Sequence, residues 1–420
     1  MAAAAAALML LALTAAAAAG ASAATAAAAT PTGTQAVAPS AAGMSTQTAA
    51  AGTLWAWGSN SQGELGNGTT AESGNPVRVR LPKGTKVTSV RAGCDASLAL
   101  TTTGKVLAWG ANTVGQLGNG TTVASHTPVR VKIPEQTKIT AVRAGCSFGL
   151  ALTSAGHVLA WGYGKDGELG NGSTGNRHRP VGVKLPAGIR VKAISAGSGQ
   201  SFALTTTGRL YAWGANGGGQ LGDGTTAGRT RPVRVKLPKG TEVKIASAGG
   251  ADGLALTTSG QLYAWGHNAY GELGDGTTTG RKTPVKINLS VPGPPIGKIT
   301  SLFAGCFHSL ALTSRGKVLA WGLNTNGQLG DGTTTERTTA VLTQLPAGTA
   351  VTAISAGCDY SLARTASGRV LAWGANGQGE LGDGTTTDRD TPVMVLLATS
   401  LKAIAIGSGP AGNDGFALIR

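Results

Sequence analysis

Short apolar runs, separated by segments rich in Gly and Pro, recur along most of the chain. In one representative stretch they occupy residues 210–214, 231–237, 243–249 and 254–256. The runs are rich in β-branched and aliphatic side chains, which is typical of β-strands bounded by turns. Residues 232–237 alternate apolar with basic side chains, the period expected of a strand with one face exposed to solvent. The pattern therefore predicts four strands in this stretch.

These four runs belong to a unit that repeats seven times. The tripeptide Ala-Trp-Gly marks each unit, and five intervals of 52 residues and one of 56 separate its tryptophans: Trp57, Trp109, Trp161, Trp213, Trp265, Trp321 and Trp373. A fixed period of about 50 residues indicates a stack of one supersecondary unit. Four antiparallel strands form the blade of a propeller, and 67 glycines with only 4% aromatic residues suit many short strands joined by turns. We predict an all-β, seven-bladed β-propeller whose tryptophans pack between neighbouring blades.

The two ends of the repeat region predict how the ring closes. Turns as short as residues 205–208 join each Ala-Leu run to the following Trp strand as a hairpin within one blade. The Trp strand at residues 53–57 has no such partner before it, and the Ala-Leu strand at residues 416–419 has no Trp strand after it. We therefore expect the N- and C-terminal strands to pair and to complete one blade together.

Residues 305–330 carry the motif of a known repeat. The pattern is Ala-Gly-x-x-x-Ser-Leu-Ala-Leu-Thr-x-x-Gly-x-Val-x-Ala-Trp-Gly-x-Asn-x-x-Gly-Gln-Leu-Gly. From residue 52 to its C-terminus the chain resembles the regulator of chromosome condensation repeat family. That resemblance implies a seven-bladed propeller but no single function, because the same fold hosts unrelated activities.

The first 51 residues differ in kind from the repeats. Residues 1–23 contain a short apolar run and end in Ala-Ser-Ala, as a cleaved secretory signal peptide does, although no Lys or Arg follows Met1. An uncleaved membrane anchor is the alternative. Residues 24–51, rich in Ala, Thr, Ser and Pro, are expected to form a disordered linker before the propeller at residues 52–420. The segment predicts a secreted or cell-surface protein.

Four cysteines occupy one repeated position, directly after Ala-Gly in units one, two, five and six: Cys94, Cys146, Cys306 and Cys358. Equivalent positions on adjacent blades approach the roughly 5.5–6 Å between Cα atoms that a disulfide needs only close to the ring axis. The innermost strand of each blade runs there. Disulfides Cys94–Cys146 and Cys306–Cys358 are therefore one interpretation, and free buried thiols are the other.

The chain carries a formal net charge of +16, and its basic residues are unevenly distributed. Between the Gly-Thr-Thr (or Ser-Thr) turn and the next Ala-Gly, the first five units are net positive and the last two are neutral. Much of this charge lies on seven residues, here called the basic rim: Arg78, Arg80, Arg130, Lys132, Arg231, Arg234 and Lys236. Such residues prevent edge-to-edge strand pairing, or they bind an anionic polymer. No aromatic residues interleave with them, which argues against nucleic acid.

Positions that differ among strict repeats indicate where a partner binds. The residues after each Ala-Gly and each Ala-Trp-Gly vary most, and propellers form binding faces from such loops. Aromatic side chains are enriched among binding hot spots. The predicted partner-binding residues are accordingly Phe148, Tyr163, His267, Tyr270, Phe307, His308 and Tyr360. Neutral drift in exposed loops is the alternative explanation.

No motif pairs a nucleophile with a base, and the five histidines follow no repeat, so we expect neither enzymatic activity nor a cofactor. The Asn or Asp of each Leu-Gly-(Asn/Asp)-Gly-Thr-Thr segment is expected to shape a turn, because calcium requires several convergent oxygens. No metal site is expected.

The sequence favours an exported, monomeric, non-enzymatic scaffold that binds a protein through one loop face. An exported member of the family that inhibits a secreted β-lactamase is similar in organisation. One alternative is guanine-nucleotide exchange or chromatin regulation inside the cell, which the resemblance implies. Another is a cell-surface module that binds anionic polymers through the basic rim.

Overall fold

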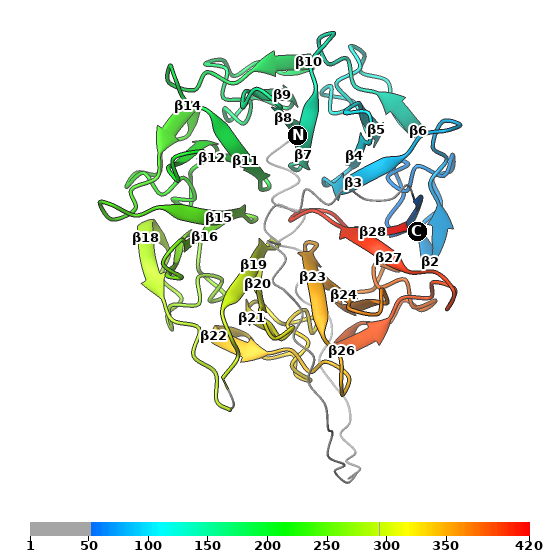
Figure 1. The fold of residues 1–420 in the computed structure, drawn as a ribbon, viewed down its shortest axis with the longest axis vertical. Helices are drawn as coiled ribbons and strands as arrows, with labels where there is room; N and C mark the ends of the chain where they lie inside the picture. Colours follow the sequence, from blue (N-terminus) through cyan, green and yellow to red (C-terminus); the bar gives the residue numbers. More distant parts are fainter. Residues whose placement is uncertain (1–51, 294) are drawn as a thin grey trace. The chain divides into compact units, whose positions relative to one another are not determined.

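The computed structural model describes residues 52–293 and 295–420, which form a closed ring of seven four-stranded antiparallel sheets (Figure 1). The predicted seven-bladed propeller is therefore confirmed. The predicted signal peptide, residues 1–23, and the predicted linker, residues 24–51, lie outside the described residues.

Strands with the same place in their blades have the same place in the repeat. The innermost strands are β3 (Val87–Ala92), β7 (Ile139–Ala144), β11 (Val191–Ala196), β15 (Val243–Ala248), β19 (Ile299–Ala304), β23 (Val351–Ala356) and β27 (Ala403–Gly407). The second strands are β4 (Ala96–Thr101), β8 (Phe148–Thr153), β12 (Gln200–Thr205), β16 (Asp252–Thr257), β20 (His308–Thr313), β24 (Tyr360–Thr365) and β28 (Asp414–Ile419).

The two outer positions of each blade follow the same rule. The third strands, which carry the repeated tryptophans, are β1 (Thr53–Gly58), β5 (Val106–Gly110), β9 (Val158–Gly162), β13 (Leu210–Gly214), β17 (Leu262–Gly266), β21 (Val318–Gly322) and β25 (Val370–Gly374). The outermost strands are β2 (Ser73–Arg78), β6 (Ser125–Arg130), β10 (Arg177–Gly182), β14 (Arg229–Arg234), β18 (Arg281–Ile287), β22 (Arg337–Leu342) and β26 (Arg389–Met394).

One blade is built from both ends of the repeat region, as the unpaired strands predicted. Its order is β2-β1-β28-β27, so two strands come from each end. Strand β1 pairs with β28 along its whole length, from Thr53 opposite Ile419 to Gly58 opposite Asp414. This terminal blade closes the ring by contacting the first blade through β3 and the sixth through β23 and β24.

The seven repeated tryptophans join each blade to the one before it. All seven side chains are fully buried. Trp109 is typical, since its Nε1 donates a hydrogen bond of 2.6 Å to the backbone carbonyl of Glu64 in the preceding blade. The same bond recurs around the ring with Glu or Gln carbonyls at 2.7–2.9 Å. The predicted packing between blades is confirmed, and the bond explains why no other aromatic residue replaces Trp.

Strand direction gives the ring two different ends. Loops that follow the innermost strands and loops that follow the third strands emerge at the same end, here called the loop face. Hairpins between second and third strands, and connections between blades, lie at the opposite end. The proline-rich insertion, residues 291–297, connects β18 with β19 and therefore belongs to that opposite end.

Candidate functional site

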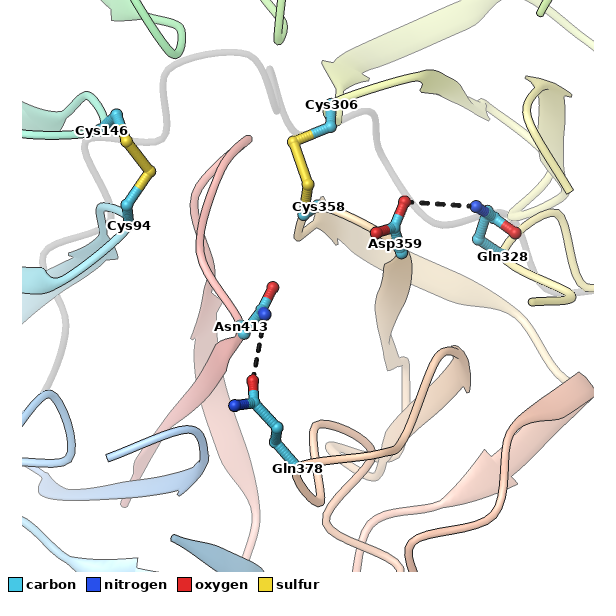
Figure 2. The surroundings of a disulfide bond; sticks show 8 residues. All are labelled: Cys94, Cys146, Cys306, Gln328, Cys358, Asp359, Gln378 and Asn413. Carbon is cyan, nitrogen blue, oxygen red and sulfur yellow. Dashed lines mark hydrogen bonds between the residues drawn. A yellow bond between two sulfur atoms is a disulfide. The ribbon is translucent and has the colours of Figure 1, made fainter. Parts of the chain in front are cut away.

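Two disulfides brace the inner rim of the loop face (Figure 2). Cys94 is bonded to Cys146 and Cys306 to Cys358, with Cα–Cα distances of 4.4 and 4.6 Å. The backbone N–H of Cys94 also donates to the carbonyl of Cys146 at 3.1 Å. The predicted pairing is therefore confirmed, and the interpretation as free thiols is wrong. The bonds form because the innermost strands converge on the axis at this level.

Side-chain hydrogen bonds tie the inner loops of this face to its outer loops. Nε2 of Gln328 reaches Oδ1 of Asp359 at 3.5 Å, and Nδ2 of Asn413 donates to Oε1 of Gln378 at 3.1 Å (Figure 2). Burial, followed by the charge of Asp388, raises the pKa of Asp359 to about 6. The loop face is therefore a braced surface, held by covalent and polar contacts between neighbouring blades.

Three of the seven predicted contact residues are not on the surface. Phe148, His308 and Tyr360 are 3%, 1% and 0% exposed, because each is the first residue of a second strand and points between blades. The hydroxyl of Tyr360 donates to the carbonyl of Asp414 at 2.6 Å, and Nε2 of His308 lies 2.9 Å from Oγ of Ser361. Their predicted placement in exposed loops is wrong, and their contacts join neighbouring blades.

Three of the remaining residues form a cluster, here called the aromatic trio: His267, Tyr270 and Phe307. Their ring centroids lie 5.4–6.2 Å apart, with Tyr270 and Phe307 edge to face. His267 and Tyr270 come from the loop after β17, and Phe307 comes from the next blade, directly before β20. All three are partly exposed. Tyr163, also partly exposed, follows β9 three blades before Phe307 and takes no part in the cluster.

A buried carboxylate that the sequence analysis missed holds the trio in place. Glu272 has a side chain only 1% exposed, and its Oε1 accepts a hydrogen bond of 2.7 Å from Nδ1 of His267. Its Oε2 accepts the backbone N–H of Tyr270 at 2.9 Å. In the equivalent loop of the next unit, Gln328 takes the place of Glu272. It accepts only the backbone bond, from the N–H of Asn326. The signal was the combination of Glu at this repeated position with a His after Ala-Trp-Gly, which only this unit has.

The contact with Glu272 changes how His267 titrates. The hydrogen bond and the charge of Glu272 raise the pKa of His267, and partial burial opposes them. We expect Glu272→Gln to lower this pKa, as measured by NMR titration of the imidazole. The charged imidazolium exists below the folded-state pKa. As pH rises, it should therefore lose its proton at a lower pH in the variant than in wild type. Glu64→Gln, the same change in a unit without this His, is the control and should leave His267 unaffected. An equal pKa in wild type and Glu272→Gln would contradict the assigned contact.

The basic rim is accessible in the structure. All seven of its residues are exposed, on β2, β6, β14 and the residues that follow them. Arg78 lies over the ring of Trp55, with its guanidinium carbon 5.3 Å from the ring centroid. The rim therefore presents unpaired positive charge to solvent at the periphery of three blades.

In the last four units, turn residues pair with an arginine that the sequence analysis did not connect to them. Asp223 accepts hydrogen bonds from Thr225 at its turn and also from Arg229, whose Nη2 lies 2.6 Å from the carboxylate. Burial raises the pKa of Asp223, but the bonds from Thr225 and Arg229 outweigh it and leave that pKa lowered. Asp275, Asp331 and Asp383 make the equivalent pairs. The assignment of these residues to turns is confirmed.

Within residues 52–293 and 295–420, no group of three or more His, Cys, Asp or Glu side chains is arranged to hold a metal ion. The same part of the chain contains no helix that is long and apolar enough to cross a membrane. A closed propeller with a braced loop face is a scaffold fold of the protein-binding class.

The chain belongs to the family defined by the RCC1-like domain, whose model matches residues 20–346. Models of the regulator of chromosome condensation repeat match residues 351–380 and 367–411. The resemblance stated from the sequence motif is confirmed at the level of this family.

Relatives in this family have diverse roles. The chain is 32% identical to the ultraviolet-B receptor UVR8 of Arabidopsis thaliana over 341 residues, 81% of this chain and 77% of that protein. It is also 32% identical to the human E3 ubiquitin-protein ligase HERC2 over 364 residues, 86% of this chain but only 7% of the ligase. The chain thus corresponds to a small part of the ligase.

Solved structures share the fold. Human WBSCR16 superimposes with a TM-score of 0.78 at 23% identity, covering 88% of this chain and 99% of that one. Prp20p of Saccharomyces cerevisiae, described together with its binding to Gsp1p and histones, has a TM-score of 0.78 at 25% identity over 90% of this chain and 92% of that one.

Proposed function

We propose that this protein is an exported, non-enzymatic scaffold that binds a protein partner through its loop face, with the aromatic trio at the centre of the contact. The trio carries the proposal. Three large rings lie together, partly exposed, on a surface that two blades share. At the equivalent positions of the other units, Tyr163 is the only aromatic residue. Clusters of aromatic side chains dominate the energy of many protein interfaces.

The rigidity of the loop face supports the same proposal. Glu272 holds the ring of His267 and the backbone of Tyr270, and the disulfide Cys306–Cys358 lies beside Phe307 in sequence. A contact surface that is already ordered loses less conformational entropy when a partner binds. Members of the family such as Prp20p, described with its binding to Gsp1p and histones, use the fold to bind proteins.

Export rests on separate observations. Residues 1–23 have the composition of a signal peptide, and the propeller has two disulfides and no free cysteine among its described residues. Disulfides persist in oxidising compartments outside the cytosol. We expect the mature protein to be recovered from the culture medium with an N-terminus near residue 24, as N-terminal sequencing would measure. Retention of Met1 inside the cell would favour an intracellular role in nucleotide exchange or chromatin regulation.

The binding surface is tested with two triple variants. His267→Ala, Tyr270→Ala and Phe307→Ala together should reduce capture of the partner from culture medium by at least about 100-fold, because hot-spot rings contribute about 1–3 kcal/mol each. The control, Arg231→Ser, Arg234→Ser and Lys236→Ser, removes charge from the basic rim and should retain capture. Quantitative mass spectrometry of the captured protein measures both.

The opposite pattern would contradict the proposal. If the basic-rim variant loses its ligand and the trio variant keeps it, the binding surface is the rim. Binding should then weaken steeply with salt, since each neutralised anionic group releases counterions. That outcome would identify a module for anionic polymers.

A further inference from the structure

The channel along the ring axis is lined by positive charge without any compensating negative charge. A cavity of about 270 Å³ lies between the innermost strands. Its charged lining residues are Arg91, Arg143, Lys192, Lys244 and Arg364, and no carboxylate lines it. Residues 1–51, which lie outside the description, contain no Asp, Glu, Lys or Arg, so they cannot supply the missing negative charge.

Arg91 and Arg143 form the most concentrated part of this charge. They occupy the same register position on the adjacent innermost strands β3 and β7, opposite Leu98 and Leu150 in their blades. Each precedes by three residues a cysteine of the disulfide Cys94–Cys146, which holds the two strands together. The ring therefore holds these two arginines on neighbouring strands, close enough for the charge of Arg91 to act on Arg143.

Neither arginine has an acidic partner among the described residues. Nη1 of Arg91 donates to the carbonyl of Val90 at 2.6 Å, and Nη1 of Arg143 donates to the carbonyl of Val142 at 2.8 Å. A guanidinium has five N–H donors, so most of them remain free for a ligand. Burial, and then the charge of Arg91, lowers the pKa of Arg143 to about 9. Two like charges held together in this way oppose folding unless an anion joins them.

Neighbouring hydroxyl and guanidinium groups extend the set of donors. Ser195 occupies on β11 the position that Arg143 has on β7. Its Oγ accepts the N–H of Ala248 at 3.1 Å, which leaves its own O–H available to donate. Farther round the channel, Nε of Arg364 is buried without a hydrogen-bond partner. These groups donate hydrogen bonds and do not repel an anion.

We propose that the channel binds a small phosphate-bearing anion, held between the guanidinium groups of Arg91 and Arg143. A single guanidinium binds phosphate oxygens through two parallel N–H···O bonds, so each of the two arginines can hold the anion in this way. The volume of the cavity admits inorganic phosphate, pyrophosphate or a comparably small phosphorylated compound, and excludes a folded polymer. This site is separate from both the loop face and the basic rim.

The test uses pyrophosphate as the probe and isothermal titration calorimetry as the measurement. Wild type should bind pyrophosphate, and Arg91→Gln with Arg143→Gln should weaken binding by at least about 10-fold, because hydrogen bonds to charged groups are lost. Arg231→Gln with Arg234→Gln removes the same charge from the basic rim and should change the affinity less than twofold. Sulfate, titrated in parallel, shows whether the site prefers phosphate chemistry and should bind more weakly.

Thermal unfolding separates loss of the site from loss of the fold. Without added anion, the channel variant should melt no lower than wild type, since removing one like-charge pair relieves repulsion. Pyrophosphate should raise the melting temperature of wild type and not that of the channel variant. Absence of both heat and thermal shift in wild type, or equal affinity of wild type and the channel variant, would overturn the proposal. The single variant Arg143→Gln, which removes only one charge, should show an intermediate affinity.

Discussion

Deletion of residues 415–420 is expected to lower the melting temperature of the propeller by roughly 10 °C or more. The deletion removes nearly all of β28, which pairs with β1 on one side and β27 on the other. Phe416, Leu418 and Ile419 are fully buried, and burial of each such side chain contributes about 1.5–3 kcal/mol. Without β28, β1 and β2 lose their connection to β27, the innermost strand of the terminal blade. Differential scanning calorimetry measures the effect.

Deletion of Arg420 alone is the matched control. This residue is exposed and follows the last residue of β28, so its removal should leave the melting temperature almost unchanged. If the longer deletion also leaves the melting temperature unchanged, pairing of β1 with β28 does not hold the ring together.

Removal of both disulfides should have an effect of similar size. Each joins positions 52 residues apart, and closing a loop of that length stabilises a protein by about 4 kcal/mol in the chain-entropy model. They link blade one to two and five to six, on either side of the terminal blade. Replacing all four cysteines by Ser should therefore lower the free energy of unfolding by up to about 8 kcal/mol, as measured by urea denaturation.

Reductant supplies the control for this experiment. Dithiothreitol should lower the stability of wild type toward that of the cysteine-free variant and leave the variant unchanged. Unfolded, unreduced wild type should contain no titratable thiol, and peptide mapping should link Cys94 to Cys146. Four titratable thiols in that sample would disprove the covalent links.

The fold, its closure and its disulfides could be predicted because a strict repeat makes positions equivalent. Cys94 and Cys146 occupy the same place in their units, so the geometry of a ring is enough to bring them together. The burial of Phe148, His308 and Tyr360 could not be predicted from the repeat. Whether a residue ends a loop or begins a strand changes its exposure completely, and sequence patterns locate such boundaries only to within a few residues.

The aromatic trio and the channel residues Arg91 and Arg143 show a second limit of prediction from sequence. Glu272 matters because it reaches His267. The combination of these two residues in one unit is visible in the sequence, but their contact follows from the path of the loop after β17. Arg91 and Arg143 had a detectable signal, since they repeat at one position in the same two units as the first pair of cysteines. Their significance becomes clear only when the channel is seen to contain no acidic residue.

The terminal blade also determines how the protein responds to mechanical force. Thr53 lies opposite Ile419, so the first residue of β1 and the last residue of β28 lie at the same end of this antiparallel pair. Tension applied between residues 53 and 419 would pull these strands apart like a zipper, breaking one backbone pair at a time. Tension between blades one and two at the loop face would instead meet the covalent bond from Cys94 to Cys146. The ring is therefore mechanically weak where β1 pairs with β28 and strong between blades one and two, and a pulling experiment should detach β28 before any of the other six blades unfolds.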